Sequence, residues 1–361
     1  MEKSKQYNRI KITLQIINQV LSFLILIVLA FTPLARLIEQ KIYTYTSNDY
    51  VAFTIFLVII GLIEIIFSVP LDFYSSYIVE HRFNLSNQNL MDWFVEKIKS
   101  YFVSSLILFP LGMTFYYLLK NYKLWWLILA FIVFVFSILL ARIAPTLIFP
   151  IFYKFIPLEN DNLKAKLTQL CQNSGINFEG IYTFNLSKNT KKANAGFTGI
   201  FKSRRIIISD TLIENFTDDE ILTVFAHELG HYKKKHIIKN ILIGLVTTFL
   251  TFYLAEYFYQ IALIKMNYSS PHQISALPVL FLILSFISIL FMPVYNSISR
   301  KFEFEADEFA VKSTGDKNSF ISSLKKLSKI NLADENPNPL IEFIFYSHPS
   351  IKRRVERVEK F

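Results

Sequence analysis

Six stretches of this sequence are apolar and nearly free of charge over the length that crosses a lipid bilayer. A hydrocarbon core of ~30 Å needs about 20 residues in a helix. The stretches cover residues 13–35, 51–71, 101–119, 124–141, 240–255 and 276–299. Hydrophobic residues make up 53% of the 361-residue chain, which is too high for a soluble protein. We therefore predict a mainly α-helical polytopic membrane protein with about six transmembrane helices.

Two polar regions, residues 152–239 and 300–361, interrupt this pattern. Four Lys and Arg residues within positions 3–11 precede the first apolar stretch, and the positive-inside rule places such a cluster in the cytoplasm. Six crossings then put both polar regions on the cytoplasmic side as well. The membrane is expected to be the cytoplasmic membrane in a bacterium or the endoplasmic reticulum in a eukaryote. Because each region alone is small for a domain, we expect the two to fold together as one unit.

The first polar region has the pattern of a small α+β unit. Helical periodicity and a glycine stop mark "LENDNLKAKLTQLCQNSG", and two short strands are predicted in "GIYTFNLS" and "SRRIIISD". A second helix is predicted in "FTDDEILTVFAHELGHYKKKH", with Thr217 as its N-cap and three acidic residues in its first turn. The single Cys171 excludes an internal disulfide and is interpreted as a packing residue.

The H-E-x-x-H pattern on this second helix points to a metal. Residues i and i+4 project from the same helix face, so His227 and His231 can hold one ion. Glu228 lies beside that ion and can accept a proton from a water that zinc has acidified. The alternative is a pair of surface histidines near a Lys-rich helix end. That alternative is disfavoured because the pattern rarely arises by chance.

A catalytic zinc needs a third protein ligand, and one stretch fits. In "SRKFEFEADEFAV", Glu303 and Asp307 lie four residues apart on a predicted helix, with Glu305 and Glu308 on other faces. Glu303 can reach the metal while Asp307 accepts the N–H of a ligand histidine. His236 does not match the third-ligand spacing of related zinc motifs, so we interpret it as structural or membrane-proximal.

Together these segments resemble the integral-membrane CAAX prenyl endopeptidases, which are zinc metalloproteases. The resemblance covers most of the chain from about residue 20. It is carried by "IVEHRFNLSNQNL", "APTLIFPIFYKFIPLEN", "NAGFTGIFKSRRIIISDTLI", "AHELGHYKKKH", "SRKFEFEADEFA" and "YSHPSIKRRV". It implies transmembrane helices around a chamber, capped by a small cytoplasmic α+β zinc-metalloprotease domain.

The resemblance also implies roles for individual residues. His227, His231 and Glu303 match the zinc ligands, Glu228 the general base and Asp307 the partner of a ligand histidine. Asn194 and Ala195 match a strand that binds substrate backbone. His348 and Arg354 match a pair near the site that could stabilise an oxyanion, although His348 alone would read as a structural histidine before a proline.

Three features depart from the family pattern. Six predicted helices stand where the family commonly has seven, so the chain is expected to lack the first. Gly196 and Thr198 occupy positions that are usually aromatic, which affects substrate preference. Glu64 interrupts the second apolar stretch, and an intramembrane carboxylate is a functional candidate that faces water or a partner.

The leading hypothesis is a zinc-dependent membrane endopeptidase that cleaves near the C-terminus of prenylated or other membrane-associated proteins and peptides. We expect an N-terminal membrane region with four helices at residues 1–151 and a metalloprotease segment at 152–239. A transmembrane hairpin at 240–299 and a segment that completes the site at 300–361 follow. One Zn²⁺ per chain, peptide substrates and membrane lipids are the expected partners. Nucleic acid is not, because no basic stripe is interleaved with aromatics. The alternative is a polytopic transporter or scaffold with a structural metal.

Overall fold

Long helices and one small sheet make up the protein. The computed structural model describes residues 2–198 and 205–360. Its first half contains α1 (Glu2–Phe31), α2 (Leu34–Tyr43), α3 (Asp49–Phe73), η1 (Tyr74–Ile78), α4 (Val79–Arg82), α5 (Leu90–Asn121), α6 (Trp125–Ile143), η2 (Ala144–Ile148) and α7 (Phe149–Phe152). The middle contains β1 (Phe155–Pro157), α8 (Asp161–Asn173), β2 (Gly180–Phe184), η3 (Leu186–Lys188), β3 (Ala195–Thr198), β4 (Arg205–Ser209), α9 (Asp210–Asn215) and α10 (Asp218–Lys233). The last part contains α11 (His236–Lys265), η4 (Ile274–Ala276), α12 (Leu277–Thr314), α13 (Lys317–Asn331), α14 (Pro339–Phe345) and α15 (Ile351–Val358).

Six helical segments of the described residues are long and apolar enough to cross a membrane, which confirms the predicted number. They are Glu2–Phe31, Asp49–Arg82, Leu90–Asn121, Trp125–Phe152, His236–Lys265 and Ile274–Thr314. Their boundaries differ from the predicted stretches. The first helix ends at Phe31 rather than Ala35, because Pro33 begins a separate helix α2 that carries Ala35. The fifth continues through Glu256, whose carboxylate accepts a 2.8 Å hydrogen bond from the Trp125 indole.

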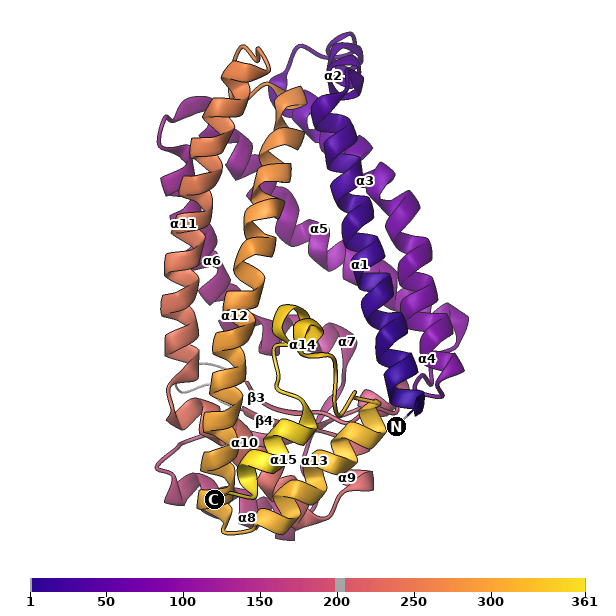
Figure 1. Cartoon of the computed structure of the whole chain (residues 1–361), viewed down its shortest axis with the longest axis vertical. Coiled ribbons are helices and arrows are strands. Elements are labelled where there is room, and N and C mark those ends of the chain that lie inside the picture. The colour runs from indigo at the N-terminus through magenta and orange to yellow at the C-terminus, as the bar shows by residue number, and fades with distance from the viewer. Residues whose placement is uncertain (1, 199–204, 361) are drawn as a thin grey trace.

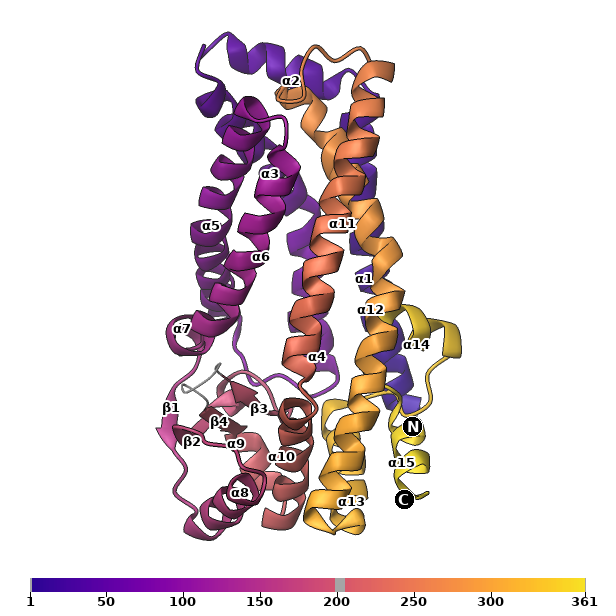
Figure 2. The same cartoon turned by 90° about the vertical axis from the view of Figure 1, so that its left-hand side faces the viewer.

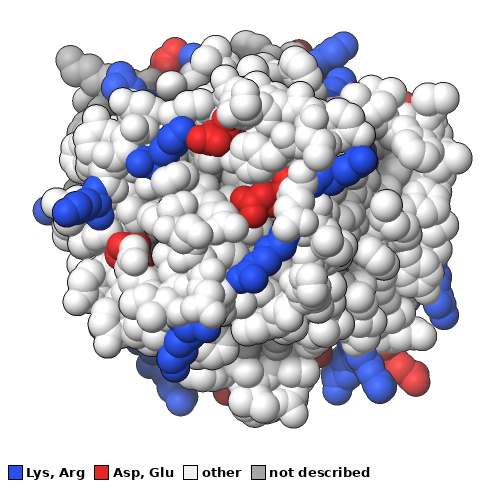
Figure 3. Space-filling view, turned by 90° about the horizontal axis from the view of Figure 1, so that it is seen from above, with Lys and Arg blue, Asp and Glu red and all other residues white. Residues whose placement is uncertain are grey.

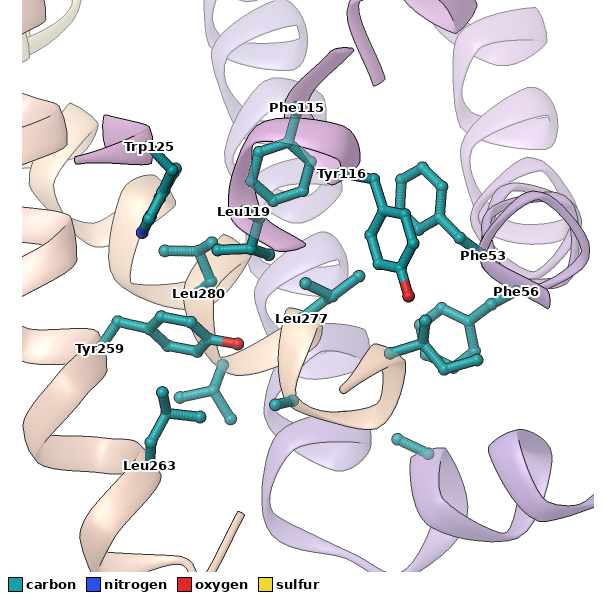
Figure 4. Close-up of a cluster of buried hydrophobic side chains, with 14 of the residues drawn as sticks. Phe53, Phe56, Phe115, Tyr116, Leu119, Trp125, Tyr259, Leu263, Leu277 and Leu280 are labelled. Atoms are coloured by element: carbon teal, nitrogen blue, oxygen red, sulfur yellow. The ribbon is translucent and has the colours of Figure 1, made fainter. Parts of the chain in front are cut away.

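The membrane helices are packed together mainly at the end far from the sheet. Figures 1 and 2 show α2 lying across that end, with both chain termini at the opposite end. Phe53 of α3 stacks on Tyr116 of α5, with ring centroids 4.3 Å apart. Figure 4 shows this cluster, to which α6, α11 and α12 also contribute. Its largest fully buried side chains are Trp125, Tyr116, Tyr259, Phe53, Phe56 and Leu29. The bundle is therefore held most firmly away from the soluble part.

Charged side chains are scattered over the far end. Figure 3 looks onto this surface and shows separate blue and red groups rather than one patch. Several of these charges are paired with groups of neighbouring segments. Lys120 forms an ion pair with Asp49, and Arg36 donates to the carbonyl of Met266. Buried Glu39 accepts from the Ser275 hydroxyl at 2.6 Å, which ties α2 to the start of the last membrane helix.

The last membrane helix and the predicted acidic helix are one continuous element. α12 runs without interruption for 38 residues and ends where Gly315 adopts a left-handed conformation, φ 68°. At 1.5 Å per residue it is about 57 Å long. The helix continues past the apolar stretch that ends at residue 299, because the following residues, among them Phe302, Ala306 and Ala310, form a buried helical stripe. α12 therefore connects the membrane region rigidly to the soluble part.

The soluble part has a four-stranded sheet in the order β1-β2-β4-β3. The two predicted strands correspond to β2 and β4, which pair in parallel, and the first two residues of the second prediction, 203 and 204, lie outside the described residues. β1 and β3 were not predicted from periodicity because each has only three or four residues. α8 ends as predicted, before Gly175 at φ 62°. Buried Cys171 lies in the core of this part, and burial raises the pKa of its thiol to about 12.

A polar face runs along α1 inside the membrane region. Gln15, Asn18, Gln19 and Ser22 recur at helical spacing and, with α12, line a cavity of about 440 Å³. The Ser22 hydroxyl donates to Glu64 of α3 at 2.5 Å, so the intramembrane carboxylate has a partner. Among the described residues, no side chain forms a hydrogen bond with the three amides of this face. An amide without a partner in hydrocarbon costs several kcal/mol, so this face is expected to contact water.

This reasoning predicts different reactivity at neighbouring positions of α1. In a Cys171→Ser background, a charged thiol reagent should label Gln19→Cys at least about tenfold faster than Val20→Cys, because thiolate forms in water and not in lipid. Val20 is 49% exposed and does not line the cavity, so it is the matched lipid-facing control. Labelling rates are measured by mass spectrometry in lipid nanodiscs. Equal rates at both positions would contradict a hydrated face.

Candidate active site

The helix α10 presents the two histidines of the H-E-x-x-H pattern. Its start has the predicted form, because the Thr217 side chain accepts from the Glu220 N–H while the Glu220 carboxylate accepts from the Thr217 N–H. Ile221, Phe225 and Leu229 are buried in the soluble core and fix the rotation of the helix. His227 and His231 consequently point to the side where α12 passes.

A glycine allows α10 and α12 to approach closely. Figure 2 shows the two helices side by side below the membrane region. A Cβ atom placed on Gly230 would lie 3.0 Å from both the Cα atom and the carbonyl oxygen of Ala306. Only glycine fits this contact without a shift of one helix. The glycine inside the H-E-x-x-H pattern thus sets the distance between the histidines and the acidic residues of α12.

Three ligand groups meet at this crossing. The Nε2 atoms of His227 and His231 are 3.1 Å apart. One oxygen of Glu303 lies 3.2 Å from His227 Nε2, and the other lies 3.3 Å from His231 Nε2. Ligand atoms held tetrahedrally by bonds of 2.0–2.2 Å are separated by about 3.3 to 3.6 Å. The observed separations are close to these values, so the three groups could hold one metal ion.

The hydrogen bonds around the histidines support the same conclusion. His227 Nδ1 lies 2.8 Å from Asp307 Oδ1, a contact that requires the proton on Nδ1 and leaves a lone pair on Nε2. Glu303 Oε2 is buried and forms no hydrogen bond with any described residue. Lone pairs of imidazole nitrogen and carboxylate oxygen therefore converge, and such a donor set favours a cation such as Zn²⁺.

Asp307 is itself held by a buried arginine. Arg354 Nε and Nη2 donate to the two carboxylate oxygens of Asp307 at 2.9 and 2.6 Å. Burial alone would lower the pKa of His227, but the neighbouring carboxylates of Asp307 and Glu303 outweigh burial and raise that pKa. A metal ion bound at Nε2 would take the place of the second imidazole proton. Burial would also lower the pKa of Arg354, and the charge of Asp307 raises it. Asp307 thus connects His227 to Arg354, whose guanidinium group carries a positive charge.

A different pair lies behind His231. His236 Nδ1 is 3.0 Å from His231 Nδ1, and His236 Nε2 is 3.0 Å from Glu305 Oε2. His236 is not one of the three converging groups, since it approaches the ring edge of His231 that faces away from Glu303. The sequence reasoning gave no role to Glu305, because acidic residues on an exposed helix face look alike in the sequence.

A cavity of about 320 Å³ opens beside the three ligand groups, and Glu228 lines it. The cavity wall also contains Asn194, Ala195, His348 and Arg354, so all of the predicted site residues except His231 and Asp307 line it. His348 Nε2 lies 3.4 Å from Glu303 Oε1, and its side chain is 64% exposed. Asn194 and Ala195 stand at the start of β3, an edge strand that pairs only with β4 among the described strands.

Sequence reasoning missed the opposite wall of this cavity, which α13 supplies. Phe320, Leu324 and Leu327 contribute apolar side chains to the cavity wall, and Asn331 also lines it. The Asn331 amide both donates to the carbonyl and accepts from the N–H of Ala193, which fixes the chain just before β3. The apolar residues follow helical spacing, but an ordinary core stripe has the same spacing. Gly196, which stands where the family usually has an aromatic residue, lies in β3. The side chain of Thr198, the other such position, lies outside the described residues.

Comparison with known proteins identifies the family. A family model described as "Peptidase family M48" matches residues 157–361, which include both histidines and Glu303. The chain belongs to peptidase family M48. A second model, described as "CAAX prenyl protease N-terminal, five membrane helices", matches residues 1–154, where the structure has four of its six spans. Together the two matches show the CAAX prenyl protease family, as the resemblance implied.

Relatives within this family cover most of the chain. It is 29% identical to "Uncharacterized metalloprotease YhfN" of Bacillus subtilis, over 99% of this chain and 85% of that protein. It is 30% identical to "CAAX prenyl protease 1" of Saccharomyces cerevisiae, over 84% of this chain and 71% of that protein. The crystal structure of S. mikatae Ste24p superposes with a TM-score of 0.87 at 28% identity, covering 99% of this chain and 88% of that one.

Family and fold together settle the class of the protein. It is a multi-pass membrane metalloendopeptidase, with a mainly helical fold and a small sheet. The transporter or scaffold considered as an alternative is therefore set aside. The M48 family implies a metal, and the three converging groups of the structure fit one.

The close contact at Gly230 predicts that a larger residue there lowers both stability and Zn²⁺ binding. Replacing Gly230 with Ala should separate α10 from α12, because overpacking of this kind costs typically 1–3 kcal/mol. Gly244→Ala is the matched control, since an added Cβ there meets no described atom within 4 Å beyond the neighbouring backbone of its own helix. Helix propensity favours Ala by about 1 kcal/mol at both sites, so the difference between the variants isolates the contact. Thermal unfolding and binding of added Zn²⁺ are measured, and unchanged Zn²⁺ affinity in Gly230→Ala would contradict the prediction.

Proposed function

We propose that the protein is a zinc-dependent endopeptidase in which His227, His231 and Glu303 hold the metal and Glu228 is the general base. The observation that carries the proposal is the convergence of three metal-binding groups at the wall of a cavity that Glu228 also lines. A closed structural zinc site commonly has four protein ligands. Three ligands beside an accessible carboxylate are typical of a catalytic site.

The chain's own residues divide the chemistry among them. Bound zinc would supply a Lewis acid that polarises the substrate carbonyl and acidifies water. Glu228 takes the proton of the attacking water and passes it to the amine that leaves. His348, exposed in the cavity, donates to the oxyanion that develops on the carbonyl. Arg354 uses Nε and Nη2 on Asp307, so it acts mainly by holding Asp307 and adding positive charge near Glu303.

Substrate binding is assigned to the edge of β3 that pairs with no described strand. An extended peptide can add to an exposed sheet edge through backbone hydrogen bonds. Asn194 and Ala195 begin this strand and face the cavity, which supports their role in holding substrate backbone. Their backbone is preset, because the Asn194 N–H donates to the Ser209 hydroxyl and its carbonyl accepts from the Ser209 N–H.

The proposed substrates are proteins and peptides at the membrane, cleaved near the C-terminus. The name of the Saccharomyces cerevisiae relative, "CAAX prenyl protease 1", supports prenylated CAAX-type proteins. In a cell that does not prenylate proteins, the same site would serve turnover of other membrane-associated peptides. The Lys and Arg residues near the N-terminus support a cytoplasmic position for the site, which is built from the segments 152–239 and 300–361 around the hairpin 240–299. Lipid contacts the spans, and no nucleic acid is involved.

The role of Glu228 is tested by removing only its charge. Glu228→Gln should keep Zn²⁺ binding, because Glu228 is not among the three converging groups, and should lower peptide cleavage by at least ~10²-fold. Cleavage of a fluorogenic peptide is followed in nanodiscs, and zinc content is measured by elemental analysis. Glu308→Gln is the control, since Glu308 pairs with Lys312 away from the cavity. Full activity in Glu228→Gln would refute the mechanism.

A further inference from the structure

The two histidines of the site are supported in different ways. His227 has a conventional carboxylate partner in Asp307. No carboxylate of the described residues pairs with His231 Nδ1, which lies 3.0 Å from another imidazole nitrogen, His236 Nδ1. A histidine that binds metal through Nε2 carries its proton on Nδ1 and needs an acceptor for it. The acceptor available to His231 is therefore His236 Nδ1.

The contacts determine the arrangement of protons along this chain. If His236 Nδ1 accepts from His231, the proton of His236 must be on Nε2. That atom lies 3.0 Å from Glu305 Oε2, which is an acceptor. His231 Nδ1–H thus donates to His236 Nδ1, and His236 Nε2–H donates to Glu305. Reversing the order would put a proton on His231 Nε2, where Glu303 and His227 converge.

The surroundings of His236 hold its ring rigidly. The side chain is only 1% exposed, and the ring stacks on Phe302 at 4.2 Å with an angle of 8°. His236 opens α11, directly after Lys235 adopts a left-handed conformation with φ 57°. Glu305 is held in turn by Lys239, one turn further along α11. The first turn of a membrane helix therefore presents this ring to the site.

We propose that His236 is a positioning residue that fixes the ring and tautomer of His231, with Glu305 as its anchor. Through this pair, the membrane hairpin of α11 and α12 orients a metal ligand that stands on α10. The inference rests on the proposed metal-binding role of His231 and adds a residue pair to it. His236 is not a fourth ligand, since its Nε2 is engaged by Glu305 and its Nδ1 faces the outer edge of His231.

The test measures metal affinity rather than activity alone. His236→Ala removes the acceptor and should weaken Zn²⁺ binding by ~10- to 100-fold, as loss of such partners typically does. Glu305→Ala should weaken it as well, whereas Glu305→Gln keeps an acceptor oxygen and should bind more nearly as the wild type does. His236→Asn places an amide oxygen near the position of Nδ1 and should restore part of the affinity. Affinities are measured by competition with a chromophoric chelator on the full-length protein.

Two further measurements separate positioning from general stability. Co²⁺ absorption spectra should change in His236→Ala and return toward the wild-type form in His236→Asn, and thermal unfolding of the metal-free proteins reports folding. Glu308→Ala, on the same helix but away from the site, is the control. If His236→Ala does not fold, Glu305→Ala and His236→Asn decide the question. Wild-type Zn²⁺ affinity in folded variants lacking either acceptor would overturn this inference, whereas absence of Zn²⁺ binding to the wild type would overturn the proposed function itself.

Discussion

The structure depends on one electrostatic constraint, the convergence of two imidazole lone pairs and a buried carboxylate within a few ångströms. This arrangement favours a cation between the groups, because Glu303 Oε2 is buried and has no hydrogen-bond partner among the described residues. The geometry is imposed by the crossing of α10 and α12, which the absence of a side chain at Gly230 permits. Helix packing therefore positions the two histidines and Glu303 without the help of a metal ion.

The groups around this centre come from distant parts of the chain. Asp307 is held by Arg354 from the last helix, α15, and His236 comes from the first turn of α11. The strand β3 is fixed at its start by Asn331 of α13. Since each contact is specific, the site forms only when the segments before and after the membrane hairpin have assembled. This is a physical reason for a hairpin inserted within one catalytic unit.

The membrane region and the soluble part are mechanically linked. The spans pack through large apolar side chains at their far end, while α1 carries amides that form no side-chain hydrogen bond with the described residues. A polar face on α1 is consistent with water approaching the cavity from the membrane side. A second network ties α1 to the chain before β3, because Glu80 accepts from Tyr7, Lys11 and Lys192. The edge strand that we propose binds substrate is therefore attached to the first membrane helix as well as to the soluble core.

Features that repeat with a fixed period or length could be predicted from the residues alone. Apolar windows of bilayer length predicted the six spans, and the spacing of four residues placed His227 with His231 and Glu303 with Asp307 on common helix faces. Which of these faces meet depends on how the helices pack against one another. The pairing of His236 with Glu305, the wall supplied by α13 and the unbroken course of α12 depend on contacts between segments far apart in the chain. Such contacts leave no periodic trace in the sequence, because an acidic residue or an apolar stripe looks the same whether it faces solvent, a core or a metal site.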